Sequence, residues 1–94
     1  MEIFSDKRYD KFFKAVASLS TKDDARKFFE DVCTIKEIED MAQRLEVAEL
    51  LSSGSNYQEV VKRTGASTAT ISRVNKCLNY GAGGYKLVLK EGDK

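Results

Sequence analysis

The sequence has 94 residues with a net charge of +1, and it contains no proline and no histidine. This composition excludes a disordered or membrane-embedded chain. Because histidine is the commonest general base and metal ligand, its absence also argues against an enzyme, a metal site or a required cofactor. The N-terminus "MEIFSDKRYD" lacks a signal-peptide pattern. We therefore expect one cytoplasmic domain without a membrane segment, short enough that a partner subunit helps to complete its core.

Two amphipathic helices are predicted in the first third of the chain. Apolar residues recur at helical spacing within residues 12–19 and again within residues 28–32. Between these segments, Ser20 or Thr21 is placed to cap the second helix. Six of the nine aromatic residues lie within residues 1–29, and we expect them to serve core and dimer packing.

A long central helix is predicted from Ile35 to Leu51. It begins with "TIKE", a capping box in which the Thr34 hydroxyl and the Glu37 carboxylate satisfy each other's backbone amides. Val47 and Leu51 project from one side of this helix, nearly opposite a second, broader apolar face. That face contains Ile38, Met41, Ala42, Leu45 and Ala48. A helix that is apolar on two sides has two partners, and the second partner can be another subunit.

The next segment predicts a helix-turn-helix unit. A short helix from Tyr57 to Thr64 is followed by Gly65, the residue that most easily adopts a left-handed turn conformation. Ser67 can then cap a second helix. The inward stripe of that helix contains Ile71, Val74 and Leu78, with Cys77 beside it. Short helix, glycine turn and second helix form the motif that places a recognition helix in the major groove of DNA.

Charge is distributed unevenly along the chain in a way that favours DNA binding. Residues 1–59 contain 13 acidic and 9 basic side chains, whereas residues 60–90 contain six basic ones and no acid. The small residues that begin the second helix allow its backbone to approach a groove, and their hydroxyls can contact phosphates or base edges. The predicted DNA-contacting residues are Gln58, Lys62, Ser67, Thr68, Ala69, Thr70, Ser72, Arg73 and Lys76.

We expect three segments within the single domain. Residues 1–54 form a helical dimerisation core, residues 55–79 form the helix-turn-helix, and residues 80–94 form a glycine-rich connector and tail. The end of the tail fits a helical turn, a strand or a docked arm equally well. Cys33 and Cys77 are expected to be reduced thiols in the core.

The residues from "CTIKEIEDMAQRLEVAELLSSG" to "GASTATISRVNKCL" resemble the Trp repressor superfamily, and with "NYGAGGY" they are similar to its YerC/YecD-like branch. The resemblance covers residues 33–78 well. It implies an all-α, intertwined homodimer with two helix-turn-helix heads that bind double-stranded DNA as a transcriptional regulator or repressor.

The resemblance also implies a small-molecule site between the central and recognition helices. Arg44 and Arg73 match two arginines that flank the amino-acid corepressor, and Thr34 matches a threonine of the same pocket. Val74 stands where the tryptophan-responsive members have glycine, and Cys77 where they have serine. A β-branched side chain in a space kept open by glycine fills the cavity, so the sequence argues against tryptophan as the ligand and leaves any other effector open.

Two questions stay open at the level of sequence. Arg73 can contact a DNA phosphate or a ligand carboxylate, and Arg44 can bind a ligand or form structural ion pairs with nearby acids. The leading hypothesis is a sequence-specific DNA-binding regulator. The alternative is a protein interaction module with a vestigial helix-turn-helix, whose aromatic N-terminal helices bind a partner.

Overall fold

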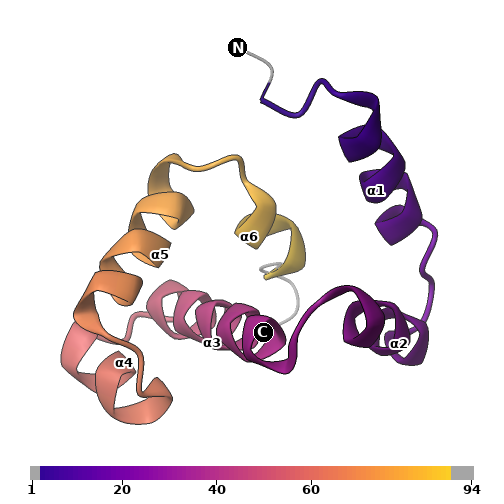
Figure 1. Cartoon of the computed structure of the whole chain (residues 1–94). Helices are drawn as coiled ribbons and strands as arrows, with labels where there is room; N and C mark the ends of the chain where they lie inside the picture. The colour runs from indigo at the N-terminus through magenta and orange to yellow at the C-terminus, as the bar shows by residue number, and fades with distance from the viewer. Residues whose placement is uncertain (1–2, 90–94) are drawn as a thin grey trace. The chain divides into compact units, whose positions relative to one another are not determined.

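A computed structural model describes residues 3–89, which form six α-helices and no strand, as the sequence predicts (Figure 1). The helices are α1 (Lys7–Ala17), α2 (Lys22–Val32), α3 (Ile35–Ser52), α4 (Tyr57–Thr64), α5 (Thr68–Tyr80) and α6 (Gly84–Val88). The chain divides into two compact units within α3, after Ile38. We call the described residues on either side the N-terminal unit (3–38) and the C-terminal unit (39–89). No helix among the described residues is long and apolar enough to cross a membrane.

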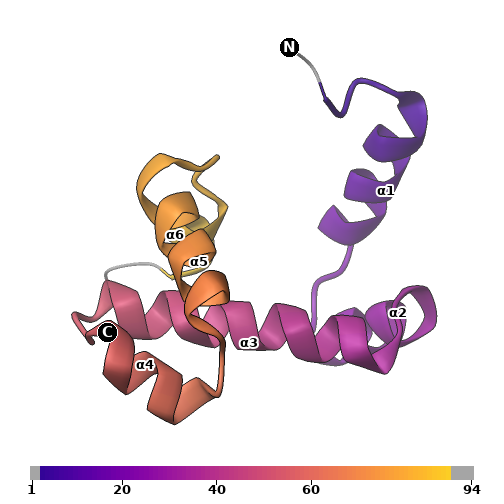
Figure 2. The same ribbon diagram turned by 60° about the vertical axis from the view of Figure 1, so that its left-hand side comes forward.

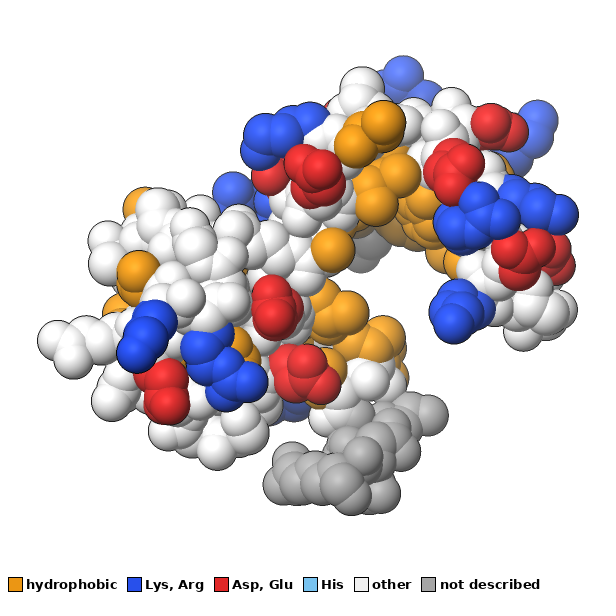
Figure 3. Space-filling view, turned by 90° about the horizontal axis from the view of Figure 1, so that it is seen from below, with side chains coloured by type: hydrophobic (Ala, Val, Ile, Leu, Met, Phe, Trp, Pro, Cys, Tyr) orange, Lys and Arg blue, Asp and Glu red, His pale blue; other side chains and the backbone are white. Residues whose placement is uncertain are grey.

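The N-terminal unit is held by caps and aromatic contacts. Asp6 accepts a hydrogen bond from the Arg8 amide at 2.8 Å and caps α1. Thr21, one of the two residues predicted to cap α2, accepts from the Asp24 amide at 3.0 Å. Aromatic rings of α1 and α2 stack at centroid distances between 5.4 and 6.1 Å. None of the described residues of this unit is buried, so its apolar side chains lie at or near the surface (Figure 3, right-hand part).

The predicted capping box starts α3. The Thr34 amide donates to Glu37 Oε1 at 2.8 Å, and the Glu37 amide donates to Thr34 Oγ1 at 3.1 Å. The helix ends at Ser52, one residue beyond the predicted end. Gly54 follows with a left-handed φ of 99°, a conformation that glycine adopts without a steric penalty.

The core lies in the C-terminal unit. Its six fully buried residues come from α3, α4, the turn that follows α4, and α5: Val47, Ala48, Val60, Ala66, Ile71 and Val74. Leu51 and Leu78 pack against this cluster as partly buried residues. The inward stripe predicted for the second helix is therefore confirmed. The second predicted face of α3 is only partly open in the described residues: Met41 and Leu45 are exposed, whereas Ala48 of the same face is buried in this cluster.

The glycine-rich connector folds back and docks α6. A Cβ atom on Gly81 would lie 2.5 Å from the Cys77 carbonyl oxygen, and Gly83 has a left-handed φ of 90°; both positions therefore need glycine. Figure 2 shows the chain turning back after α5 so that α6 lies beside that helix. Tyr85 and Leu89 pack against the core. Of the three conformations open for the tail, a docked helical turn is found, while residues 90–94 lie outside the described part.

Both cysteines are free, but the prediction of two core thiols is wrong for Cys77. Its side chain is exposed, and that of Cys33 is only half-buried. Cys77 lies three positions after the buried Val74 on α5, but the core does not extend far enough along the helix to cover it.

Candidate nucleic-acid interface

The predicted turn between α4 and α5 has the geometry of a helix-turn-helix. Asn56 caps α4 by accepting from the Glu59 amide at 2.9 Å. Gly65 ends the helix in the left-handed conformation, with φ 75° and ψ 4°, and its amide donates to the Val61 carbonyl at 2.8 Å. A residue with a side chain is strained at this φ. Val60 of α4 and Ile71 of α5 meet in the buried cluster, so the turn sets how the two helices pack.

A hydrogen-bonded clamp fixes this turn from within. The Thr64 hydroxyl donates to the Val60 carbonyl at 2.8 Å and accepts from the Ala66 amide at 3.1 Å. From α3, Gln43 Nε2 donates to the Thr64 carbonyl at 3.1 Å. Gln43 therefore satisfies a carbonyl left free at the end of α4 and ties the helix-turn-helix to the central helix.

Sequence reasoning missed Gln43 as a positioning residue. Its partner Thr64 is 21 positions away along the chain, and no motif at that spacing predicts the contact. The one signal in the sequence is that Gln43 is a polar residue on the same side of the central helix as the apolar Val47 and Leu51. A polar side chain that is buried at such a position needs a hydrogen-bond partner.

The recognition-helix residues begin with a cap and a small-residue turn. Ser67 accepts from the Thr70 amide at 3.1 Å and caps α5, as predicted. Ser67, Thr68 and Ala69 are exposed, and Thr70 is half-buried. The first-turn amides of α5 lie at the positive end of the helix dipole, and no bulky side chain shields them. This end of α5 can approach a polyanion closely.

One exposed face of α5 continues from this turn. Ala69, Ser72, Arg73 and Lys76 follow one another at spacings of three and four residues, which places them on the same side of the helix, and all four are exposed. Gln58 and Lys62 lie one turn apart on α4 and are exposed as well. The structure thus places all nine predicted DNA-contacting residues on α4, on α5 or at its cap.

The cations of this surface have no carboxylate partner within residues 3–89. By contrast, four cations of residues 6–30 form ion pairs with nearby carboxylates, namely Arg8, Lys14, Arg26 and Lys27. Arg73, Lys76 and Lys62 form no ion pair with any carboxylate in residues 3–89. Their charge therefore remains available to an external anion.

The four candidate ligand residues are dispersed over the elements. Thr34 belongs to the capping box in the N-terminal unit. Cys77 lines an apolar cavity of about 410 Å³ together with Leu45 and the glycine-rich connector, but Arg44 and Arg73 do not line it. Arg44 is half-buried, and the ion pairs expected for it are not found among the described residues.

Val74 stands where the tryptophan-responsive members have glycine, and the sequence predicts that its side chain fills the space that glycine leaves open. Its side chain is 1% exposed and belongs to the core cluster with Val47 and Ile71. The isopropyl group therefore serves the core of this chain, where a glycine would leave a space.

Comparisons with known proteins agree with this geometry. The family model described as "Trp repressor protein" matches residues 7–93. The Bacillus subtilis (strain 168) protein named "Uncharacterized protein YerC" is 49% identical over 83 residues, which cover 88% of this chain and 80% of the relative.

Two crystal structures have the same fold. A TrpR-like protein from Eubacterium eligens ATCC 27750 has a TM-score of 0.92 and 45% sequence identity to this chain. The match covers 99% of this chain and 96% of the Eubacterium eligens chain. A protein from Staphylococcus aureus has a TM-score of 0.91 and 36% identity, covering 98% of this chain and 92% of its own. With a family model matched over nearly its whole length, the chain belongs to the Trp repressor family.

Proposed function

We propose that this protein is a sequence-specific, DNA-binding transcriptional regulator that acts as a homodimer in the cytoplasm and inserts α5 into the major groove. One observation carries the proposal: α5 presents exposed small residues in its first turn, followed on the same face by Arg73 and Lys76, which form no ion pair within residues 3–89. Phosphate contacts position a recognition helix, and base-edge contacts give it sequence preference.

The distribution of roles follows from side-chain length. Arg73 and Lys76 are long enough to reach phosphate oxygens or guanine. Ser67, Thr68 and Thr70 supply hydroxyls, and the Ala69 methyl can meet a thymine methyl. From α4, Gln58 and Lys62 would contact the flanking backbone. These contacts define one half-site.

The homodimer is supported by apolar surface that the chain does not cover. Phe4 is 59% exposed, Phe13 49% and Ile35 76%. In the C-terminal unit, Met41 and Leu45 of α3 are exposed as well. Soluble monomers rarely leave so many large apolar side chains in water, whereas subunit interfaces bury them. Two-fold symmetry then predicts a palindromic operator with half-sites about 34 Å apart.

Selection of bound fragments from genomic DNA tests the proposal. We expect a palindromic motif whose affinity falls with salt. The double variant Arg73→Ala/Lys76→Ala should bind more weakly and lower the slope of log K against log salt by about two, one for each lost phosphate contact. The matched control Lys7→Ala/Lys11→Ala removes the same charge from α1 and should leave that slope unchanged. Failure of the wild-type protein to select any fragment would refute the proposal.

Tryptophan dependence is tested with the selected operator. Because Val74 is buried at the position where tryptophan-responsive members have glycine, we expect the same operator affinity with and without added L-tryptophan. A tryptophan-dependent rise in affinity would show that the space beside Arg73 can open.

The second candidate function is protein binding through the N-terminal helices, with a helix-turn-helix that does not bind DNA. The exposed phenylalanines of the N-terminal unit favour it. It predicts that Arg73→Ala/Lys76→Ala leaves the cellular phenotype unchanged whereas Phe12→Ser abolishes it. The DNA-binding proposal predicts that the double variant alone produces the phenotype of a gene deletion.

A further inference from the structure

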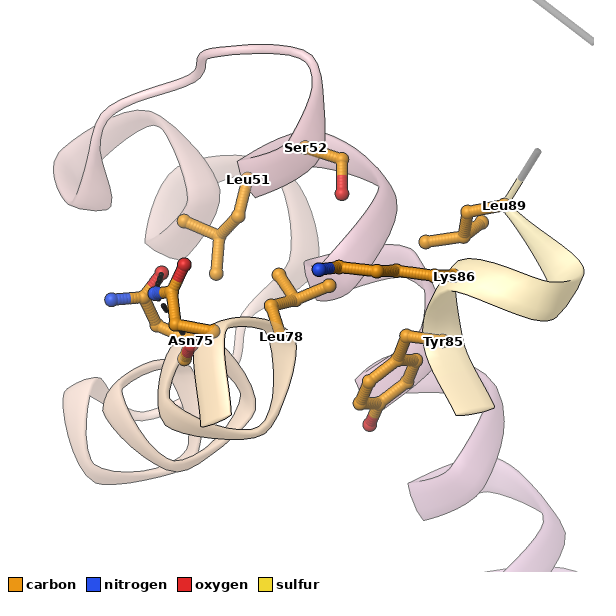
Figure 4. Close-up of a pocket in the computed structure, with 8 residues that line it drawn as sticks. Leu51, Ser52, Asn75, Leu78, Tyr85, Lys86 and Leu89 are labelled. Atoms are coloured by element: carbon orange, nitrogen blue, oxygen red, sulfur yellow. Dashed lines mark hydrogen bonds between the residues drawn. The ribbon is translucent and has the colours of Figure 1, made fainter. Parts of the chain in front are cut away.

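A second cavity lies on the C-terminal half of the recognition helix. Its volume is about 350 Å³, and it lies between the end of α3, the last turns of α5, and α6 (Figure 4). Leu51, Leu78 and Leu89, one from each of the three segments, form its apolar part. All three also pack against the core, so the core holds the apolar side of the cavity in place. The volume has room for about a dozen water-sized groups, and it lies within the usual range for small-molecule sites.

The polar lining of this cavity, as far as residues 3–89 form it, carries positive charge and no negative charge. Lys86 extends from α6 toward Leu78, and it forms no ion pair with any described carboxylate (Figure 4). None of the described lining residues is acidic. Asn75 and Asn79 line the opposite part, where Asn79 Nδ2 donates to the Asn75 carbonyl at 3.0 Å. Asn75 Nδ2 has no acceptor among residues 3–89 and is free to donate to a ligand.

We propose that this cavity binds a small organic carboxylate with an apolar body. The carboxylate would pair with Lys86, with the Asn75 amide as a further donor, and the apolar body would lie on the three leucines. Hydrogen bonds between ions of opposite charge are the strong ones, and the uncompensated ammonium selects against a cationic ligand. The C-terminal ends of α3 and α5 carry a fraction of a negative charge from their helix dipoles, which favours a cationic ligand. An amine of the same shape therefore tests whether Lys86 or the helix dipoles decide the ligand's charge.

Occupancy of the site would act on DNA binding, a part of the inference that rests on the proposed function. Asn75, Leu78 and Asn79 belong to the same helix as Arg73 and Lys76. A ligand between them and Lys86 would add contacts that hold α5 against α6 and the end of α3. It would thereby change the population of α5 orientations that fit a groove.

Binding is measured by titrating the ¹⁵N-labelled protein with 3-phenylpropionate and 4-methylpentanoate, and with 3-phenylpropylamine as the charge-reversed competitor. We expect saturable amide shifts at Asn75, Leu78 and Lys86 with both acids and none with the amine. Lys86→Met keeps the apolar stem and should weaken binding of the acids roughly tenfold. Lys11→Met, which removes the same charge from the exposed surface of α1, should leave the dissociation constant of the acids unchanged.

A second variant separates loss of the site from loss of the fold. Ser52 lines the cavity at the exposed end of α3, so Ser52→Trp fills the opening without disturbing the core and should abolish the shifts while the rest of the spectrum is retained. Absence of saturable shifts with both acids, shifts that Lys86→Met does not weaken, or tighter binding of the amine would each overturn the proposal.

The link to DNA is measured separately, by fluorescence anisotropy on the selected operator. Saturating 3-phenylpropionate should change the operator affinity of the wild-type protein about fivefold or more, and it should not change that of Lys86→Met. If the acids bind through Lys86 but no DNA is selected, the proposed function fails and the site stands. If DNA is selected and the acids do not bind, the site alone fails.

Discussion

The two units of the chain have equally clear helix signals but very different burial. In the C-terminal unit, six of the described residues are buried, and Ile71 among them is fully inaccessible to water. In the N-terminal unit, none of the described residues is buried, although α1 and α2 are capped and amphipathic in the same way. Caps and periodicity therefore define helices, while stability requires a second surface against which the apolar face can pack.

Charge separates the two units as well. The N-terminal unit pairs its cations with its own carboxylates, as in the bonds of Arg26 to Asp23 and Glu30. In the C-terminal unit, Arg73 and Lys76 have no such partner among the described residues. We interpret the first unit as an assembly surface whose charges are already compensated, and the second as a surface that uses its charge on an external anion.

The largest expected effect is a core truncation in the C-terminal unit. Ile71→Ala removes buried methyl groups and leaves a cavity, so the free energy of unfolding should fall by about 2–5 kcal/mol. Urea denaturation followed by circular dichroism measures this change. The matched control is Leu87→Ala, because Leu87 is 72% exposed and its truncation should have little effect on the free energy of unfolding. Equal losses for the two variants would contradict the assignment of the core to the buried cluster.

A smaller effect is expected at the uncovered aromatic surface. Phe13 is half-exposed within the chain. Burial of its exposed half against a second subunit would contribute about 1 kcal/mol per copy, and therefore about 2 kcal/mol per symmetric dimer. Phe13→Ala should therefore raise the dimer dissociation constant roughly thirtyfold, as measured by sedimentation equilibrium, while the helix content of each chain is retained. An unchanged dissociation constant would place the subunit contact elsewhere.

Features that depend on neighbours within three or four residues could be predicted from the sequence. The capping box of Thr34 and Glu37, the left-handed Gly65 and the Ser67 cap all involve a side chain and a backbone group less than one helical turn apart. Spacing alone specifies such contacts. These local contacts determine where the helices begin and end, and the helix bounds in turn determine which residues lie on the exposed face of α5.

Features that depend on distant segments could not be predicted. The Gln43 bond to Thr64 and the docking of α6 require knowledge of which helix lies beside which. Cys77 was expected in the core because the apolar stripe of α5 continues past Val74, but the cover provided by α3 and α4 does not continue with it. Periodicity shows on which face of a helix a side chain lies, but it does not show how far the neighbouring helices extend over that face.

The Gln43 clamp is expected to have an effect near 1 kcal/mol. Gln43→Ala removes the donor and leaves the half-buried Thr64 carbonyl without it, so the free energy of unfolding should fall by about 1 kcal/mol. Because this bond ties the turn to α3, operator affinity should fall as well, although Gln43 touches no DNA in the proposed complex. Gln58→Ala is the matched control, since it should lower affinity without changing stability. If Gln43→Ala changes neither quantity, packing alone holds the turn.

The smallest effect is expected for the ion pairs of the N-terminal unit. Side-chain hydrogen bonds to Asp23 and Glu30 raise the pKa of Arg26, whose side chain is 55% exposed. A raised pKa stabilises the fold at every pH below the ordinary pKa of arginine, and this contribution is lost only as the pH rises through the higher folded-state pKa. Arg26→Gln should therefore leave the pH dependence of Tm unchanged between about pH 6 and about pH 9. Because exposed pairs are screened by water and salt, its Tm should also stay close to that of the wild-type protein in thermal melts. A clear loss of stability would indicate that Arg26 is covered in the assembled protein, and would extend the assembly surface from the phenylalanines to the charged side of α2.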